Sequence, residues 1–326
     1  MSDLCEAYLS ACRKGLIMGK KRLPKKESTL AIDDGRIRRH IMPLLGKRKV
    51  KDLTTADINK FMRDVATGKT AVDEKTGSRG RAIVEGGKGT AARTVGLLGG
   101  ILSFAVSEGI ITTNPVRGVK RPADRKRDLR LTEDDYRRLG CALTEAESEG
   151  ENPQALLFAR LLCLTGCRRG EIEQLKWSEV DMPGRCFRLQ DSKEGASVRP
   201  IGGPVIASLS SLPRPGAYVL PGRMAGKPFL GFPKAWQRIT DRAGLDGVTA
   251  HTLRHSFASV ANDLGFTEPT IAAMLGHSSG TITGRYIHHL DSALVAAADR
   301  VARRIWALIT GEQSTVIELA TARRNG

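Results

Sequence analysis

The carboxyl-terminal third of the sequence concentrates side chains that can act as nucleophiles, proton carriers and anion ligands. His251 and Arg254 are three residues apart, and His277 and Tyr286 follow in a segment rich in Ser, Thr and Gly. If the first part is helical, His251 and Arg254 lie on one face of one turn. The stretch therefore combines a permanent cation, two imidazoles and a phenol.

Such a set suits attack on a phosphodiester by a tyrosine hydroxyl. Ionising a tyrosine of pKa about 10 costs roughly 4 kcal/mol at neutral pH, and nearby cations lower that cost. Arginine suits the charged transition state because its planar fork binds two phosphate oxygens and keeps its charge. Histidine can donate a hydrogen bond or pass a proton near neutral pH. The leaving 5′ oxygen also needs a proton, so we expect a second arginine and a general acid elsewhere.

Candidates for both lie upstream. Arg168 and Arg169 stand where an apolar helix breaks into a glycine-flanked turn, and Glu171 is close enough in sequence to hold an arginine in place. Alternating residues over 186–201 predict a β-hairpin with Lys193 near its tip. The required second arginine and a basic side chain that can serve as the acid are therefore present.

This ordered set resembles the tyrosine recombinase (phage integrase) family. The resemblance rests on T-G-C-R-R-G-E at 165–171, Lys193 in the hairpin, H-T-L-R-H at 251–255, L-G-H at 275–277 and R-Y-I-H at 285–288. It spans most of residues 130–310, and the shared order of the motifs makes it specific. The sequence departs from the family at Gly284, where a larger residue is common. We expect local flexibility at that position and no loss of chemistry.

The resemblance implies roles in strand cleavage. Arg168 and Arg254 would clamp the scissile phosphate, and Glu171 would buttress Arg168. Lys193 would be the general acid for the departing 5′ hydroxyl.

It also implies how the nucleophile is served. His251 would assist proton transfer, His277 would hydrogen-bond the phosphate, and Tyr286 would attack it to form a 3′-phosphotyrosine. That linkage conserves the bond energy for rejoining, so no metal, nucleotide or other cofactor is implied.

The family resemblance implies a mainly α-helical fold with a small β-sheet. An amino-terminal helical core-binding (SAM-like) domain and an α+β catalytic domain would form a C-shaped DNA clamp. The implied activity is site-specific recombination for integration or excision of a mobile element. The implied partners are double-stranded DNA, a homotetramer on synapsed sites, and accessory DNA-bending proteins or an excisionase.

Positive charge is concentrated in the first part of the chain. Residues 1–130 contain 29 Lys and Arg against 14 Asp and Glu, which is +15 of the total net charge of +17. So basic a half is typical of a polyanion-binding module, with a merely soluble basic surface as the plainer alternative. We expect phosphate contacts from Lys47, Arg48, Lys49, Lys88, Arg93, Lys120 and Arg121.

The 326 residues suffice for two domains. We expect a helical DNA-binding domain over 1–117, a basic linker over 118–130, a catalytic domain over 131–310 and a loose tail over 311–326. Many members of the family that the chain resembles carry a further amino-terminal arm-site domain, and we expect this chain to start at the core-binding helices. This suggests a simple recombinase or a truncated reading frame.

Local signals predict the elements of the first domain. Helices are expected over 2–16, from a Ser28 cap through Ile41 to an end marked by Pro43 and Gly46, after a Thr54 cap, and from a Thr90 cap to Glu108. An extended loop is expected over 68–89.

In the second domain, helices are expected near 133–147, 153–167, 229–243 and 291–309, with the hairpin over roughly 184–202. The apolar stripe of the last helix could pack on its own domain or on a neighbouring subunit.

Several classes of protein are disfavoured. The sequence contains no G-x-x-x-x-G-K-[ST] and no H-E-x-x-H motif. No long apolar run or signal pattern is present, so we expect a cytoplasmic, nucleoid-associated protein without a membrane segment. The six cysteines show no C-x-x-C pair and are expected to be reduced, with Cys163 and Cys167 filling the core.

Plainer alternatives accompany the catalytic interpretation. His251 and His255 have a spacing that can bind zinc, but no third ligand is obvious. Alone, Tyr286, Lys193 or Arg168 would be an ordinary packed tyrosine, hairpin lysine or salt-bridge partner, and only their ordered conjunction favours catalysis. A type IB topoisomerase or a catalytically inactive DNA-binding protein are the competing functions. The target site, the direction of recombination and cleavage in cis or in trans stay open.

Overall fold

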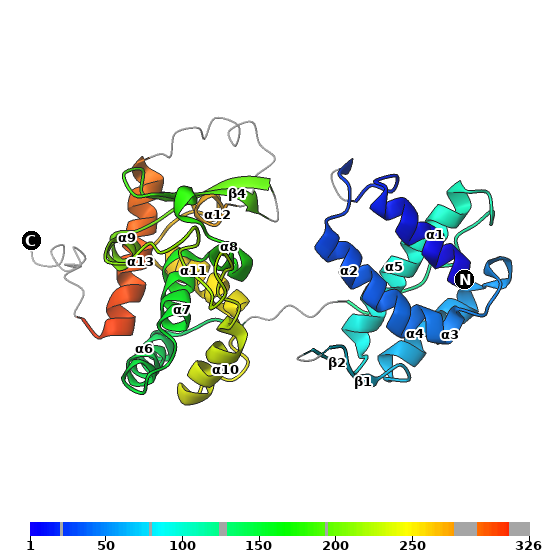
Figure 1. Ribbon diagram of the computed structural model, residues 1–326, viewed down its shortest axis with the longest axis horizontal. Coiled ribbons are helices and arrows are strands. Elements are labelled where there is room, and N and C mark those ends of the chain that lie inside the picture. Colours follow the sequence, from blue (N-terminus) through cyan, green and yellow to red (C-terminus); the bar gives the residue numbers. More distant parts are fainter. Residues whose placement is uncertain (20–21, 78–79, 124–128, 193–194, 277–291, 313–326) are drawn as a thin grey trace, which may run out of the picture. The chain divides into compact units, whose positions relative to one another are not determined.

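The chain divides into two compact units, Met1–Arg127 and Asp128–Gly326 (Figure 1). The computed structural model describes residues 1–19, 22–77, 80–123, 129–192, 195–276 and 292–312. Each unit has its own hydrophobic core.

Unit 1 is a bundle of helices with one small hairpin (Figure 1). Its elements are α1 (Ser2–Arg13), α2 (Glu27–Arg36), a π-helical turn η2 (Ile37–Ile41), α3 (Met42–Leu45), a 3-10 turn η3 (Val50–Asp52), α4 (Thr55–Ala66), β1 (Val72–Lys75), β2 (Arg81–Val84) and α5 (Lys88–Ser107). Helix α5 is the one described helix whose length and mean hydropathy of 1.3 would suit a membrane span. Its apolar residues Val95, Leu98, Ile101 and Leu102 are buried in the core of unit 1, which accounts for that composition.

Some boundaries in unit 1 differ from the predictions. Helix α2 begins at Glu27, so Ser28 is not its cap, and the helical path continues past Pro43 but ends at Leu45, before the predicted Gly46. The π-helical turn shifts the hydrogen-bond register, so that Pro43 falls in the first turn of α3, where a missing N–H costs nothing. Helix α5 begins at Lys88 with Gly87 before it, so the predicted Thr90 cap is also wrong.

The expected extended loop over 68–89 contains the antiparallel hairpin of β1 and β2, with Val72 opposite Val84. Arg81 forms an ion pair with Asp73 across it. Strand β1 is exposed and mostly charged, and the mostly apolar β2 has no polar–apolar alternation, which explains why the pattern indicated a loop.

The predicted Thr54 cap is confirmed. Its hydroxyl accepts the Asp57 N–H at 3.3 Å, while the Asp57 carboxylate accepts the Thr54 N–H at 3.0 Å. The same reciprocal arrangement of Thr132 and Asp135 opens the first helix of unit 2. Such caps are predictable because both partners lie within four residues.

Unit 2 surrounds a buried helix with further helices and a three-stranded antiparallel sheet of order β3-β4-β5 (Figure 1). Its elements are α6 (Glu133–Ser148), α7 (Pro153–Thr165), α8 (Arg169–Glu173), a 3-10 turn η4 (Trp177–Glu179), β3 (Val180–Asp181), β4 (Cys186–Ser192), β5 (Gly195–Pro200), α9 (Gly203–Ser210), α10 (Phe232–Arg242), α11 (Ala250–Asp263), α12 (Glu268–Met274) and α13 (Ser292–Thr310). The predicted helices and hairpin of this part are confirmed within a few residues.

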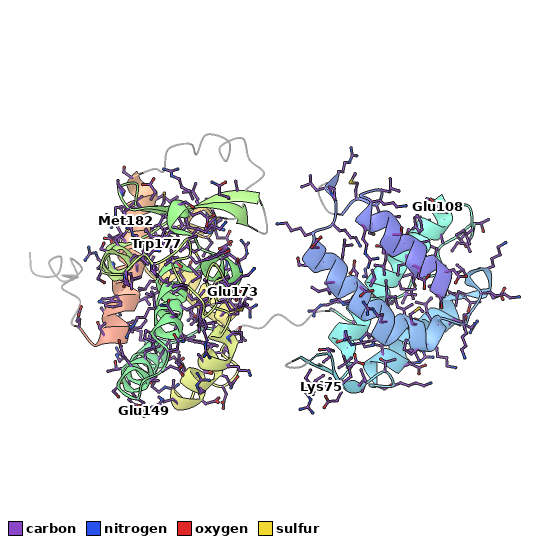
Figure 2. The ribbon with its side chains drawn as sticks, in the orientation of Figure 1. Lys75, Glu108, Glu149, Glu173, Trp177 and Met182 are labelled. Atoms are coloured by element: carbon purple, nitrogen blue, oxygen red, sulfur yellow. The ribbon has the colours of Figure 1, made fainter. Side chains whose placement is uncertain are left out.

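Helix α13 packs on its own unit. Val301, Ile305 and Ile309 are buried in the core of unit 2. A Cβ atom at Gly140 of α6 would lie 1.9 Å from the Ile309 carbonyl oxygen, so the two helices approach closely only because that position lacks a side chain. Figure 2 shows side chains around the helices and the sheet of unit 2, with Glu149 at the end of α6.

Candidate active site: an arginine cluster around Glu171

The turn after α7 brings three of the predicted site residues together, Arg168, Glu171 and Arg254. Gly166 ends α7 in the left-handed conformation, with φ of +60°, and Arg168 then precedes α8. A Cβ atom at Gly166 would lie 2.8 Å from carbon atoms of both Phe257 and Leu275. A glycine is therefore required twice here, for its backbone conformation and for the close packing of this turn against α11 and the end of α12.

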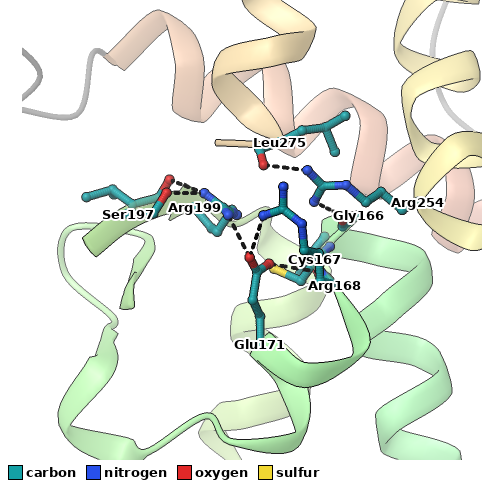
Figure 3. A network of polar contacts seen from close by, with 10 residues as sticks. Gly166, Cys167, Arg168, Glu171, Ser197, Arg199, Arg254 and Leu275 are labelled. Atoms are coloured by element: carbon teal, nitrogen blue, oxygen red, sulfur yellow. Dashed lines mark hydrogen bonds and ion pairs between the residues drawn. The ribbon is translucent and has the colours of Figure 1, made fainter. Parts of the chain in front are cut away.

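The carboxylate of Glu171 holds two arginines. Its Oε1 atom accepts hydrogen bonds from Nη1 of Arg168 at 2.9 Å and from Nη2 of Arg199 at 2.8 Å, and its Oε2 atom accepts the backbone N–H of Arg168 at 2.9 Å (Figure 3). The predicted contact between Glu171 and Arg168 is confirmed.

Glu171 is ionised despite its position inside unit 2. Burial acts to raise its pKa, but the charge of Arg199 and the hydrogen bonds from Arg168 outweigh burial and place the pKa below the ordinary value. A charged carboxylate is consequently available to orient Arg168, whose side chain is 21% exposed.

Arg254 is buried, and backbone carbonyl groups hold it. Its Nη1 donates to the carbonyl oxygen of Gly166 at 2.7 Å, and its Nη2 donates to that of Leu275 at 2.8 Å (Figure 3). Burial, followed by the positive charge of Arg168, lowers the pKa of Arg254 to about 10. The guanidinium is still charged at neutral pH, and its high energy there would be relieved by an incoming anion.

The described part of this cluster therefore contains three guanidinium groups, from Arg168, Arg199 and Arg254, around the single carboxylate of Glu171. The excess of positive charge lies in a partly buried setting, where Coulomb interactions are less screened than in water. Planar guanidinium groups match the oxygens of a phosphate, so the arrangement suits binding of a phosphodiester and of the charge that develops on it.

Two histidines lie on the surface of α11, beside Arg254 in sequence. The Nε2 atoms of His251 and His255 are 3.0 Å apart, so one ring donates a hydrogen bond and the other accepts it. Within the described residues no group of three His, Cys, Asp or Glu side chains could hold a metal ion. The geometry suits a proton-passing pair.

Three of the predicted catalytic residues lie outside the described residues. These are Lys193, between β4 and β5, and His277 and Tyr286, between α12 and α13. Their roles stay predictions.

Arg199 was not singled out by the sequence analysis. It lies on β5 directly opposite Phe187, a fully buried residue of β4. Because opposite residues of an antiparallel pair point to the same face, an arginine opposite a core phenylalanine is the signal that could have identified it.

The seven residues expected to contact DNA are all exposed in unit 1. Arg48 pairs with Asp57 at 3.1 Å, and the guanidinium of Arg121 lies against Gly96 of α5. Exposure is necessary for phosphate contact, but the role itself remains a prediction.

Comparison with known proteins gives matches in both units. The pattern of the "Phage integrase family" matches residues 129–293, and that of the "Phage integrase, N-terminal SAM-like domain" matches residues 19–65. A shufflon-specific DNA recombinase of Escherichia coli is 31% identical over 259 residues, which cover 77% of this chain and 62% of the relative. The match therefore spans less than two thirds of that relative. The tyrosine recombinase XerD of Mycobacterium leprae is 28% identical over 81% of this chain and 85% of its own length.

Solved structures support the fold. A lambda integrase dimer bound to a COC′ core site matches with a TM-score of 0.63 and 20% identity, covering 86% of this chain and 95% of that one. The Tn1549 transposon integrase in complex with circular intermediate DNA matches with a TM-score of 0.61 and 15% identity, covering 91% and 98%. The expected fold class, mainly α-helical with a small sheet and an amino-terminal SAM-like domain, is confirmed.

Proposed function

We propose, on the premise that the chain belongs to the phage integrase family, that it is a site-specific recombinase that cleaves and rejoins DNA through a 3′-phosphotyrosine. The observation that carries the proposal is the convergence of Arg168 and Arg254 on the turn at Gly166, with Glu171 holding the first and backbone carbonyls holding the second. Two guanidinium groups held in this way support the proposal that a phosphate binds to both.

In the proposed reaction, the Tyr286 hydroxyl attacks the scissile phosphorus. The bond from phosphorus to the tyrosine oxygen forms, and the bond to the 5′ oxygen breaks. His251 receives the tyrosine proton, and Lys193 donates a proton to the leaving oxygen. Arg168 and Arg254 stabilise the charge on the non-bridging oxygens.

Rejoining reverses these steps with a 5′ hydroxyl of the partner strand as the nucleophile. His277 hydrogen-bonds the phosphate in both directions. Each step replaces one phosphoester bond with another, because the phosphotyrosine bond takes the place of the DNA phosphodiester bond. The cycle therefore requires no external energy source.

The proposal assigns separate tasks to parts of the chain. Residues 1–117 are the core DNA-binding domain, 118–130 the linker, 131–310 the catalytic domain and 311–326 the tail. Positive charge on the first part, through Lys47, Lys49 and their exposed neighbours, attracts the phosphate backbone.

Assembly is proposed by analogy with related proteins. A lambda integrase tetramer bound to a Holliday junction has a fold like that of this chain, with a TM-score of 0.63. We infer that this chain also forms a homotetramer on two synapsed duplexes at the nucleoid, assisted by DNA-bending proteins or an excisionase.

The test starts by selecting bound duplexes from a randomised pool with the full chain. A nicked suicide version of the selected duplex is then incubated without metal, and products are separated on a denaturing gel. We expect a covalent protein–DNA adduct in the wild type and, with two intact sites, joined strands from different duplexes. Tight binding without any adduct would contradict cleavage, and adduct with relaxation but no strand exchange would contradict recombination.

A further inference from the structure

The arginine at position 199 is buried without contacting solvent. Its side chain is 0% exposed and is the largest fully buried side chain among the described residues. Removing a guanidinium from water is costly, and an apolar residue would pack opposite Phe187 without that cost. We therefore expect the charge at this position to have a specific task.

The charge acts on the residue that holds Arg168. Arg199 and Arg168 donate to the same oxygen, Oε1 of Glu171, at 2.8 and 2.9 Å. The second oxygen is fixed by the backbone N–H of Arg168. These three contacts come from two elements, β5 and the start of α8, and they leave the carboxylate a single orientation.

Arg199 also lies beneath the turn that follows α12. A Cβ atom at Gly276 would lie 1.3 Å from Nη1 of Arg199, so the guanidinium occupies the space that any other residue at 276 would need. The neighbouring Leu275 carbonyl accepts the hydrogen bond from Arg254. A single buried side chain thus supports the carboxylate that holds one arginine and packs against the turn that holds the other (Figure 3).

We propose that Arg199 is a positioning residue for strand cleavage, which keeps Glu171 charged and aligned so that Glu171 in turn orients Arg168. The proposal rests on the proposed recombinase function. Arg199 does not touch the phosphate, because it is enclosed behind Glu171 and Gly276. Consistent with this task, the charge of Arg199 is the largest influence that opposes the effect of burial on the pKa of Glu171.

The test compares Arg199→Gln with Arg199→Lys in the full chain, because both side chains are polar and only lysine keeps the charge. Single-turnover cleavage of the selected suicide duplex is measured over an acidic-to-neutral pH series, alongside duplex affinity and thermal unfolding. Arg185→Gln is the matched control, since it removes an ion pair of 2.9 Å between the base of the same sheet and Asp299 of α13.

We expect Arg199→Gln to slow cleavage about tenfold to a hundredfold, as is typical of a side chain that orients a functional group from behind. Arg199→Lys and the control should lose much less, and duplex affinity should stay within a few-fold. Without the positive charge the pKa of Glu171 rises, so the acidic limb of the cleavage profile should move upward by about one pH unit or more in Arg199→Gln. A residue that only stabilised the sheet would not shift that limb.

The double variant Arg199→Gln/Glu171→Gln separates the two explanations. If Arg199 acts through Glu171, its replacement should have little further effect once Glu171 is neutral. Equal losses in both backgrounds, or an unshifted acidic limb in Arg199→Gln, would overturn the proposal. If Arg199→Gln does not fold, the pH profile of Arg199→Lys is compared with that of wild type. An acidic limb at the wild-type pH supports the role of the charge, and an acidic limb shifted to higher pH contradicts it. Absence of adduct in the wild type would instead contradict the proposed function.

Discussion

The basic side chains expected to contact DNA in unit 1 and those of the cluster around Glu171 in unit 2 differ in their exposure to water. In unit 1, Lys47 and Lys49 are exposed to water. In unit 2, Arg199 and Arg254 are 0% and 4% exposed and are held by fixed partners. Exposed charges attract a polyanion at little structural cost, but salt screens them. Buried charges are costly to place, yet they need no reorganisation when a phosphate reacts.

The affinity for duplex DNA and the rate of strand cleavage should therefore be separable. Substitutions in the cluster around Glu171 should change the rate of cleavage and leave binding nearly intact. Substitutions among the exposed residues of unit 1 should do the reverse.

The largest effect is expected from Arg254→Lys. A lysine ammonium cannot donate in a planar fork to Gly166, Leu275 and a phosphate together, so cleavage should fall by about a hundredfold to a thousandfold. Single-turnover cleavage and duplex affinity are the measurements. Arg242→Lys, at an exposed ion pair with Glu149, is the control and should cleave normally. A loss of duplex affinity as large as the loss of cleavage rate would contradict the proposal that affinity and rate depend on different residues.

A similarly specific effect is expected from Lys193→Ala. If Lys193 is the general acid, cleavage slows because the 5′ oxygen leaves as an alkoxide. A substrate with sulfur at the 5′ bridging position should restore the rate, since a thiolate leaves without a proton. A variant that stays slow on that substrate would remove Lys193 from this role.

The exposed residues of unit 1 should govern salt dependence. Affinity should fall steeply as salt rises, and Lys47→Gln/Lys49→Gln should reduce the slope of log K against log salt by about 2. Lys69→Gln, in the same unit and paired with Asp64, serves as the control. The role of unit 1 in binding the phosphate backbone would be contradicted if the affinity of the wild type did not depend on salt. It would also be contradicted if Lys47→Gln/Lys49→Gln and Lys69→Gln had the same slope.

Contacts between residues that are close in the chain could be predicted from the sequence. Thr54 with Asp57, and Arg168 with Glu171, are three residues apart, so spacing alone indicates the contact. The position of Arg254 on helix α11 could also be predicted, because a helical pattern fixes which residues share a turn.

Contacts that depend on the packing of distant segments could not be predicted in this way. The ion pair between Arg199 and Glu171 joins residues 28 apart, and the close approach of Gly276 to Arg199 requires the assembled sheet and α12. The hairpin of β1 and β2 was missed for another reason, since neither the exposed, mostly charged β1 nor the mostly apolar β2 shows a polar–apolar alternation.

The smallest effect is expected on stability. The pKa of Glu171 in the folded chain is below its ordinary value of 4.5, where burial is outweighed by Arg199 and Arg168. The Glu171 charge therefore contributes fully to the free energy of unfolding above pH 4.5, and this contribution disappears as the pH falls through the lowered pKa. The difference in free energy of unfolding between wild type and Glu171→Gln, from urea titrations, should shrink in that acidic window. A difference independent of pH would show that the Glu171 charge does not stabilise the fold.

The most direct measurement locates the DNA on the protein. The sequence contains four tyrosines, of which Tyr8 and Tyr136 are buried and Tyr218 is partly exposed. The covalent adduct would be digested, and the peptide that carries the 3′-linked nucleotide identified by mass spectrometry. The account predicts modification of Tyr286 alone, and no adduct in Tyr286→Phe. A nucleotide on Tyr218, or on a residue other than tyrosine, would contradict it.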